Sequence, residues 1–124
     1  MKHFISPTQK KGYKAETVAC IFLTKKGFRI TERNFTRKCG EIDIVAEKAG
    51  VIHFIEVKSV SRESMMRAED NMHSLKQRKM ARVIAVYLMS HSVLEWQCDL
   101  VCVKLDDSAR KAEVECLYDI ILEN

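Results

Sequence analysis

Two short hydrophobic segments separated by a turn constrain the fold of this chain more than any other part of its sequence. Residues 41–47 and 52–58 each have the Ile-, Val- and Phe-rich composition of a β-strand. The stretch Lys48-Ala49-Gly50 between them is short enough for an antiparallel hairpin. Because so apolar a hairpin must be covered, the pattern predicts a sheet with helices packed against it.

The rest of the chain supplies two predicted helices and three further strands. Helical spacing of small and apolar residues predicts one helix over residues 8–26, ended by Gly27, and another over residues 70–90. Alternating patterns predict strands at residues 28–35, 96–104 and 112–118. Residues 59–69 lack a clear period, and we expect a loop or a frayed helix there. The order α-β-β-β-α-β-β favours a single α/β domain over residues 1–124, a five-stranded mixed sheet flanked by helices.

Composition and charge narrow the class of partner. Hydrophobic residues make up 47% and charged residues 31% of the chain, which excludes a disordered protein. No apolar run approaches the roughly 18 residues of a membrane helix, and the N-terminus lacks a signal peptide, so we expect a cytoplasmic protein without a membrane partner. Residues 1–98 carry 18 basic and 10 acidic groups, a net +8, whereas residues 99–124 carry a net −4. This basic body favours a polyanionic partner such as nucleic acid.

The predicted hairpin also carries charged side chains in a pattern that indicates chemistry. Side chains alternate along a strand, so Glu56 and Lys58 share one face. A four-residue loop places Asp43 opposite Glu56, whereas a two-residue loop places Glu41 there instead. Either register leaves Asp43, Glu56 and Lys58 on the same face of the sheet.

Two carboxylates that face each other across a strand pair repel, so a cation is expected between them. Lys58 lies about 6.6 Å along the strand from Glu56, too far to bridge both acids. A divalent cation such as Mg²⁺ fits better, because it takes oxygen ligands and binds through one or two carboxylates. Such an ion polarises a phosphodiester and acidifies a bound water, while Lys58 orients that water or offsets charge on the phosphorane. The alternative is a solvated strand face with a weak ion pair.

Two helical positions are candidates to join this cluster. Glu16 lies at the edge of the apolar stripe of the first predicted helix, where a surface glutamate is the alternative. Lys76 precedes Met80 by one helical turn, which places it on the buried side of the second helix, where a lysine needs an acidic partner. Lys79 is the rival position on that helix, and we favour Lys76.

Together these segments resemble the YraN family of small bacterial proteins. The resemblance rests on Ala15-Glu16, Arg33-Asn34-Phe35, the stretch Gly40-Glu41-Ile42-Asp43-Ile44-Val45, the stretch Phe54-Ile55-Glu56-Val57-Lys58, Lys76-Gln77-Arg78-Lys79 and residues 96–101. That family is assigned to the restriction-endonuclease-like superfamily, known by its PD-(D/E)xK motif, and is similar to archaeal Holliday junction resolvases. The resemblance covers nearly the whole chain, and the paired GEID and EVK segments are more specific than an ExK pattern alone.

The resemblance implies an endonuclease that hydrolyses DNA with Mg²⁺ or Mn²⁺. Branched DNA is the implied substrate of resolvase-like members, and a homodimer is their implied assembly. By the same resemblance, Asp43 is the metal-binding aspartate, Glu56 the second acidic ligand and Lys58 the catalytic lysine. Glu16 matches a helix glutamate that assists metal binding, and Glu41 belongs to the family signature and would support the metal shell.

Further positions are implied to bind substrate. Lys76 matches an auxiliary helix lysine that touches the substrate backbone, and Lys79 and Arg33 are additional candidates. Family members commonly carry an arginine two residues after the motif lysine, followed by a glycine-containing loop. Here Val60 occupies that position, and Arg62 is the candidate replacement. A non-catalytic nucleic-acid-binding or protein-interaction module with the same fold is the alternative function.

Overall fold

The computed structural model describes residues 7–59, 74–106 and 111–120 of the chain. Its elements follow the predicted order α-β-β-β-α-β-β, which is thereby confirmed. They are helix α1 (Pro7–Lys25), strands β1 (Arg29–Arg37), β2 (Gly40–Lys48) and β3 (Val51–Ser59), helix α2 (Ser74–Ser90), and strands β4 (Glu95–Asp106) and β5 (Lys111–Leu117).

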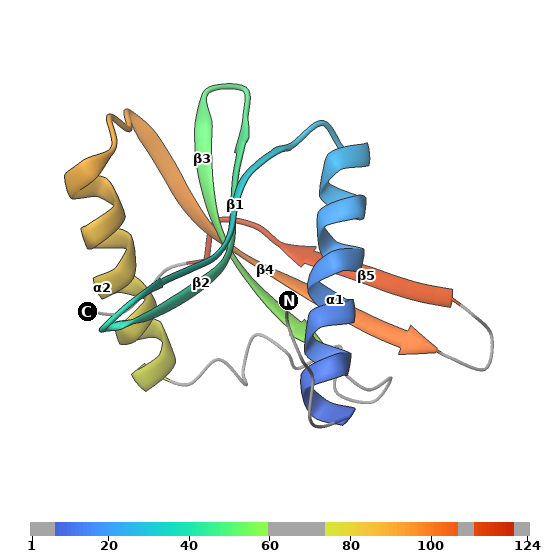
Figure 1. Ribbon diagram of the computed structural model, residues 1–124. Coiled ribbons are helices and arrows are strands. Elements are labelled where there is room, and N and C mark those ends of the chain that lie inside the picture. Colours follow the sequence, from blue (N-terminus) through green and yellow to red (C-terminus); the bar gives the residue numbers. More distant parts are fainter. Residues whose placement is uncertain (1–6, 60–73, 107–110, 121–124) are drawn as a thin grey trace.

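The five strands form one mixed sheet, as predicted. Their spatial order is β1-β2-β3-β4-β5, with β3 and β4 parallel and the other neighbouring pairs antiparallel. A parallel pair needs a long crossover connection, and α2 lies within it, between β3 and β4 (Figure 1). No helix in the described part is long and apolar enough to cross a membrane.

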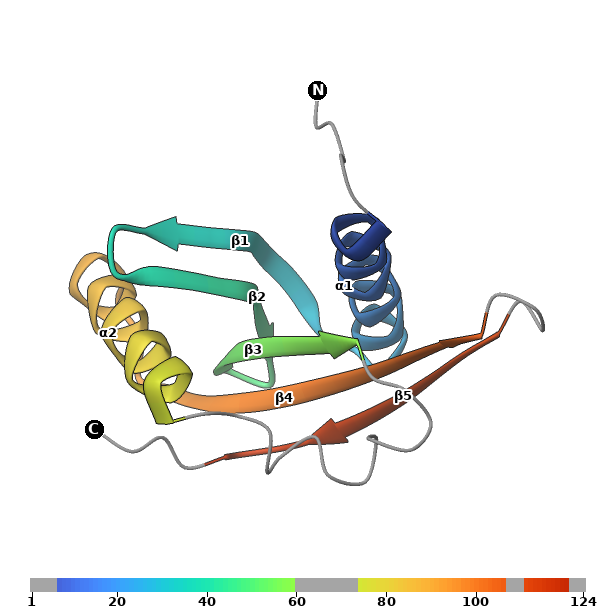
Figure 2. The same ribbon diagram turned by 90° about the horizontal axis from the view of Figure 1, so that it is seen from below.

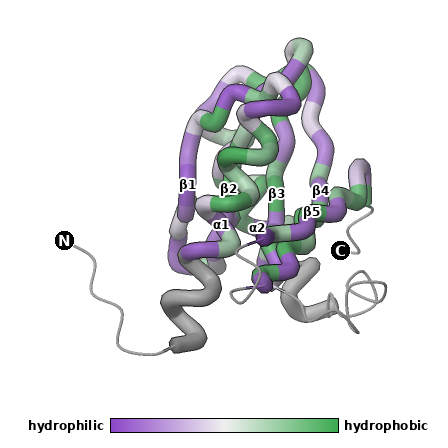
Figure 3. The backbone as a smooth tube through the Cα atoms, turned by 90° about the vertical axis from the view of Figure 1, so that its right-hand side faces the viewer, coloured by the Kyte–Doolittle hydropathy of each residue, from purple (hydrophilic) through white to green (hydrophobic). Residues whose placement is uncertain are grey.

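The two helices cover opposite sides of the sheet (Figures 1 and 2). On one side Ile84 of α2 packs with Val45 and Phe54. On the other side Leu23 of α1 packs with Ile55. The hydrophobic segments gather in the middle strands, whereas the edge strand β1 is largely hydrophilic (Figure 3). The hairpin of β2 and β3 is therefore buried on both faces, which explains its almost continuous apolar composition.

Helix α1 ends where the sequence predicted. Gly27 has a φ of 94°, the left-handed conformation that glycine adopts at little cost. The N–H of Gly27 donates to the carbonyl of Thr24 at 3.1 Å, and the N–H of Phe28 donates to that of Leu23 at 3.0 Å. These two bonds form a Schellman motif, which ends the helix and directs the chain into β1.

The β2–β3 hairpin differs from our expectation in its loop. Lys48 pairs with Val51, so the loop contains only two residues. Glu47 nevertheless pairs with Ile52, which is the register that we expected to direct Asp43 toward Glu56. Our expectation that a two-residue loop would place Glu41 opposite Glu56 is wrong, because β2 and β3 extend further into the turn than we predicted.

The remaining boundaries differ modestly from the predictions. Strand β4 runs over Glu95–Asp106 and is longer than predicted at both ends. Helix α2 begins at Ser74 in the described part, and its predicted start at residues 70–73 lies outside it. The loop predicted for residues 59–69 also lies outside the described residues, apart from Ser59, which belongs to β3.

Candidate active site at a strand fork

The two strands of the central hairpin separate at Asp43. The ladder between β2 and β3 ends at the pair Ile44 and Ile55. Beyond it, the backbone N–H of Val57 donates to Oδ2 of Asp43 at 2.8 Å. A side chain therefore takes the place of a main-chain partner, and the Asp43 carboxylate lies in the fork between the strands.

The alternation of β2 is interrupted at the same residue. Ile42 packs in the cluster on the α2 side, whereas Ile44 packs on the α1 side, although regular alternation would place both on one face. Asn34 of β1 lies between the residues that pair with Ile44 and Ile42, and its φ of 54° is left-handed. Our assumption of regular alternation through Asp43 is wrong, and this interruption accompanies the turn of its carboxylate into the fork.

Asp43 shares this buried space with Glu56, whose exposed fraction is only 5%. Burial raises the pKa of Asp43 from 3.8 to about 8. The negative charges of Glu56 and Glu16 and a side-chain hydrogen bond with Glu56 raise this pKa as well, while the bond from Val57 opposes the shift. The structure thus brings the two predicted acidic ligands together, in an environment that raises the pKa of Asp43 and so favours its protonated form.

Helix α1 contributes a third acid near this pair. An Nη atom of Arg33 on β1 lies 3.9 Å from Oε1 of Glu16 and donates to the hydroxyl of Thr17 at 3.3 Å. The side chains of Glu16 and Arg33 are 17% and 30% exposed. Arg33, which the family resemblance suggested as a substrate contact, lies against α1 and next to Glu16.

Lys58 is half-buried on β3, two residues beyond Glu56. It pairs with Cys102 of β4. Burial raises the pKa of the Cys102 thiol to about 11, and the positive charge of Lys58 works against that shift. Glu41, by contrast, is exposed and accepts a hydrogen bond from Thr36 at 3.0 Å. Its charge is not among those that raise the pKa of Asp43.

The predicted substrate-binding residues are only partly described. Lys79 is exposed on α2, close to Gly40 at the start of β2. Lys76 belongs to α2, but its side chain lies outside the described part, and Arg62 lies outside the described residues altogether.

The donor set of the fork suits one kind of metal ion. Within the described residues, no group of three or more His, Cys, Asp and Glu side chains is arranged to hold a metal. Asp43 and Glu56 offer two carboxylates, too few for a structural zinc site. Mg²⁺ is commonly held by one or two carboxylates and keeps several waters, so the pair fits Mg²⁺ or the similarly oxygen-seeking Mn²⁺.

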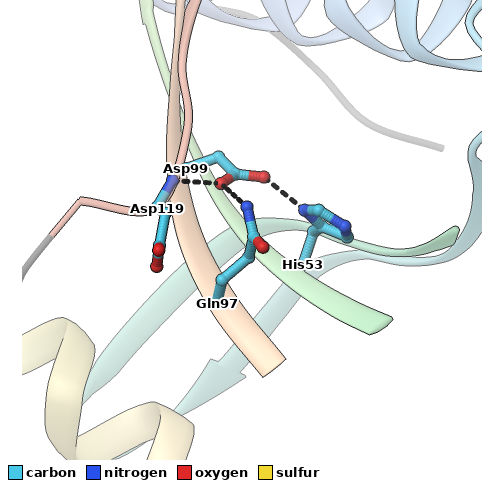
Figure 4. Close-up of polar contacts among 4 residues, drawn as sticks. All are labelled: His53, Gln97, Asp99 and Asp119. Atoms are coloured by element: carbon cyan, nitrogen blue, oxygen red, sulfur yellow. Dashed lines mark hydrogen bonds and ion pairs between the residues drawn. The ribbon is translucent and has the colours of Figure 1, made fainter. Parts of the chain in front are cut away.

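Sequence reasoning missed a second buried polar cluster, on β3 and β4. Nδ1 of His53 lies 2.5 Å from Oδ2 of Asp99, which is fully buried. The side-chain amide of Gln97 and the backbone N–H of Asp119 donate to Oδ1 of Asp99 at 2.8 and 2.9 Å (Figure 4). The available signal was a histidine and an aspartate inside apolar strands, since buried polar side chains need partners.

The fold and the fork define an α/β protein with one mixed sheet and a pair of adjacent carboxylates, those of Asp43 and Glu56, where two strands separate. The family described as "Uncharacterised protein family UPF0102" matches residues 15–103. The chain belongs to this family, which is the YraN family. The matched segment includes Glu16, Asp43, Glu56 and Lys58.

Individual relatives agree with this assignment. A UPF0102 protein of Campylobacter lari is 43% identical over 97 residues, which cover 77% of this chain and 85% of the relative. A UPF0102 protein of Helicobacter hepaticus is 42% identical over 91 residues, covering 73% and 80%. One of Campylobacter fetus is 40% identical over 96 residues, covering 75% and 82%. The chain therefore spans most of the length of these relatives.

Proposed function

We propose that this protein is a divalent-metal-dependent endonuclease that hydrolyses phosphodiester bonds in DNA. The observation that carries the proposal is the meeting of the half-buried Asp43 with the buried Glu56 at the strand fork, with Lys58 two residues further on. Two adjacent carboxylates repel when both are ionised, so they hold either a shared proton or a cation, and perturbed acids of this kind are candidates for a metal site. The resemblance to PD-(D/E)xK nucleases supports the same interpretation.

A Mg²⁺ or Mn²⁺ ion held by Asp43 and Glu56 would polarise the scissile phosphodiester and acidify a bound water. The chain's own residues prepare this site. The N–H of Val57 fixes the direction of the Asp43 carboxylate, which gives up its proton when the cation is bound. Lys58 then orients the attacking water or offsets the charge that develops on the phosphorus oxygens.

The proposed substrate follows from charge and from the family resemblance. The basic body of the chain, +8 over residues 1–98, attracts a polyanion. The resemblance to Holliday junction resolvases supports recognition of DNA shape, such as a branch, by a homodimer. We propose that it acts in the cytoplasm, where bacterial DNA lies.

A cleavage assay tests the proposal. Purified protein is incubated with linear duplex, single-stranded and four-way-junction DNA in Mg²⁺, in Mn²⁺ and in EDTA. We expect cleavage of at least one substrate with metal and none in EDTA. Asp43→Asn, Glu56→Gln and Lys58→Gln each lower the rate by at least about a hundredfold, as loss of a group that stabilises the transition state does.

Two matched variants serve as controls. Glu47→Gln removes an acid from the same strand as Asp43, but one whose side chain pairs with Arg29 at the surface, at 2.7 Å. Lys48→Gln removes an exposed lysine from β2, the strand of Asp43. We expect both control variants to cleave DNA at the rate of the wild type. Absence of cleavage with every substrate and metal, or equal activity of the Asp43 and Lys58 variants and the wild type, would refute the proposal.

The +8 body favours one alternative, a nucleic-acid-binding protein without turnover. It predicts salt-sensitive DNA binding that survives Asp43→Asn, with no product at any metal. The same samples distinguish the two functions, because the binding and cleavage measurements use the same DNA substrates.

A further inference from the structure

A cluster of exposed basic side chains lies where the tip of the β1–β2 hairpin meets α2. Arg37 ends β1, and Lys38 follows it in the turn. Lys79 and Arg82 lie one helical turn apart on α2. All four side chains are exposed, and we call this set the basic corner.

Close packing between α2 and the hairpin holds the two halves of the basic corner together. A Cβ atom on Gly40 would lie 3.3 Å from a methyl group of Val83 and 3.6 Å from Cβ of Lys79. The absence of a side chain at Gly40 therefore lets the helix pack directly on the start of β2. Figures 1 and 2 both show the hairpin tip beside α2. The basic corner is thus a fixed feature of the fold.

Arg37 is held in place for recognition. Its guanidinium lies 4.0 Å from the centre of the Phe35 ring, and its Nη1 donates to the carbonyl of Thr36 at 2.7 Å. A guanidinium has five N–H donors, so most of them stay available for an anion such as a phosphate. Because stacking restricts the side chain in advance, less conformational entropy is lost on binding.

Within the described part of the chain, the surroundings of the basic corner carry little negative charge. Helix α2 contains no Asp or Glu over its whole length, Ser74–Ser90. The single acid at the hairpin tip, Glu41, accepts a hydrogen bond from Thr36. Among the described residues, no Asp or Glu forms an ion pair with any member of the basic corner. The field of these four cations is therefore directed toward an external anion.

The basic corner lies near the proposed catalytic fork. Gly40 precedes Asp43 by three residues, about 10 Å along a strand. That distance corresponds to roughly three base-pair steps of a DNA duplex, at about 3.4 Å each. We propose that the basic corner binds the phosphate backbone of duplex DNA beside the bond to be cut, an inference that rests on the proposed function. Phosphate contacts of this kind fix position and carry no sequence preference.

The test compares two variants with the same loss of charge. The corner variant is Arg37→Gln/Lys38→Gln/Lys79→Gln/Arg82→Gln. The control variant changes four exposed lysines elsewhere and is Lys25→Gln/Lys26→Gln/Lys48→Gln/Lys111→Gln. Binding of a short fluorescent DNA duplex is measured by anisotropy in EDTA, over a series of salt concentrations. Circular dichroism and thermal unfolding confirm that both variants fold.

We expect the corner variant to bind at least about tenfold more weakly than the control at low salt. The slope of log affinity against log salt falls by about 0.9 for each phosphate that the variant no longer neutralises, hence by up to about 3.6. The control keeps a slope close to that of the wild type. Equal affinities and slopes for the two variants overturn the inference. If the wild type still cleaves DNA in that case, the proposed function stands. If the wild type binds no DNA at all, both fail.

Discussion

Asp43, which is half-buried, and Asp99, which is fully buried, are carboxylates of the same sheet with opposite surroundings. The Asp99 carboxylate is hydrogen-bonded to Nδ1 of His53, and it accepts hydrogen bonds from the side-chain amide of Gln97 and a backbone N–H. Asp43 receives one backbone N–H and faces a second buried carboxylate, that of Glu56. The carboxylate of Asp99 is satisfied by hydrogen bonds. The carboxylate of Asp43 is repelled by that of Glu56 whenever both are ionised.

The difference distinguishes a carboxylate that stabilises the fold, Asp99, from one that does not, Asp43. A buried acceptor with several donors stabilises the folded state once its desolvation is offset. A buried acid beside another acid destabilises it at any pH where both are ionised. Departures from favourable local chemistry concentrate at functional sites, so we propose Asp43 as the functional aspartate and interpret Asp99 as a structural one.

The largest expected effect is the loss of stability on Asp99→Ala. The substitution leaves the buried ring of His53, the half-buried side-chain amide of Gln97 and the N–H of Asp119 without their acceptor. We expect the free energy of unfolding to fall by about 3 kcal/mol, or roughly 10 °C in Tm. Urea denaturation at neutral pH measures it. A fall of less than about 1 kcal/mol in the free energy of unfolding would show that the hydrogen bonds of Asp99 contribute little to stability.

Asp43→Asn is expected to change stability in the opposite direction. In EDTA at pH 8 the variant should be more stable than the wild type by about 2 kcal/mol, because it removes a poorly accommodated charge. The sign follows from the raised pKa, about 8 when folded against 3.8 when unfolded. Between these values the unfolded chain has lost a proton that the folded chain retains, so wild-type stability falls as pH rises from about 4 to about 8.

The control for this experiment is the pH dependence itself. The advantage of Asp43→Asn should be small near pH 4 and grow steadily up to pH 8. Thermal unfolding at a series of pH values in EDTA records both proteins. An advantage that is constant with pH would show that packing, rather than ionisation of Asp43, separates them.

The contrast between the two aspartates also shows how far the sequence could be interpreted. The Ile-, Val- and Phe-rich composition of residues 41–47 and 52–58 predicted the central hairpin, and the acids in it predicted the meeting of Asp43 and Glu56. The fork itself was not predictable from that pattern. It depends on where the ladder stops and on the left-handed backbone of Asn34 in the neighbouring strand, and both are set by tertiary packing.

The His53–Asp99 contact was hidden for a different reason. The two residues are 46 positions apart and meet only because β3 and β4 are parallel in one particular register. That register is a matter of tertiary structure, which no local pattern encodes. Gln97 and Asp119 join the network from β4 and from the chain after β5, so the whole cluster is a product of topology.

Metal binding should offset the repulsion between Asp43 and Glu56. It should thereby reduce the difference between Asp43 and Asp99. At pH 8, Mg²⁺ at ten times its dissociation constant stabilises the wild type by about 1.4 kcal/mol. EDTA reverses the effect, and Asp43→Asn shows little of it. At pH 6 the effect is smaller, because the ion must displace the proton of Asp43. Stabilisation that is equal in the wild type and the Asp43 variant would place the bound metal elsewhere.

The smallest expected effect identifies which further acid belongs to the cluster. The charge of Glu16 raises the pKa of Asp43, so Glu16→Gln should lower that pKa, by less than about one unit. The pH-dependent loss of stability then ends at a lower pH than in the wild type. Glu41→Gln is the matched control, because Glu41 is exposed and bonded to Thr36. Unfolding free energies measured against pH in EDTA give both values. An equal shift in the two variants would show a general effect of net charge, whereas a shift confined to Glu16→Gln makes Glu16, and not Glu41, the third acid of the fork.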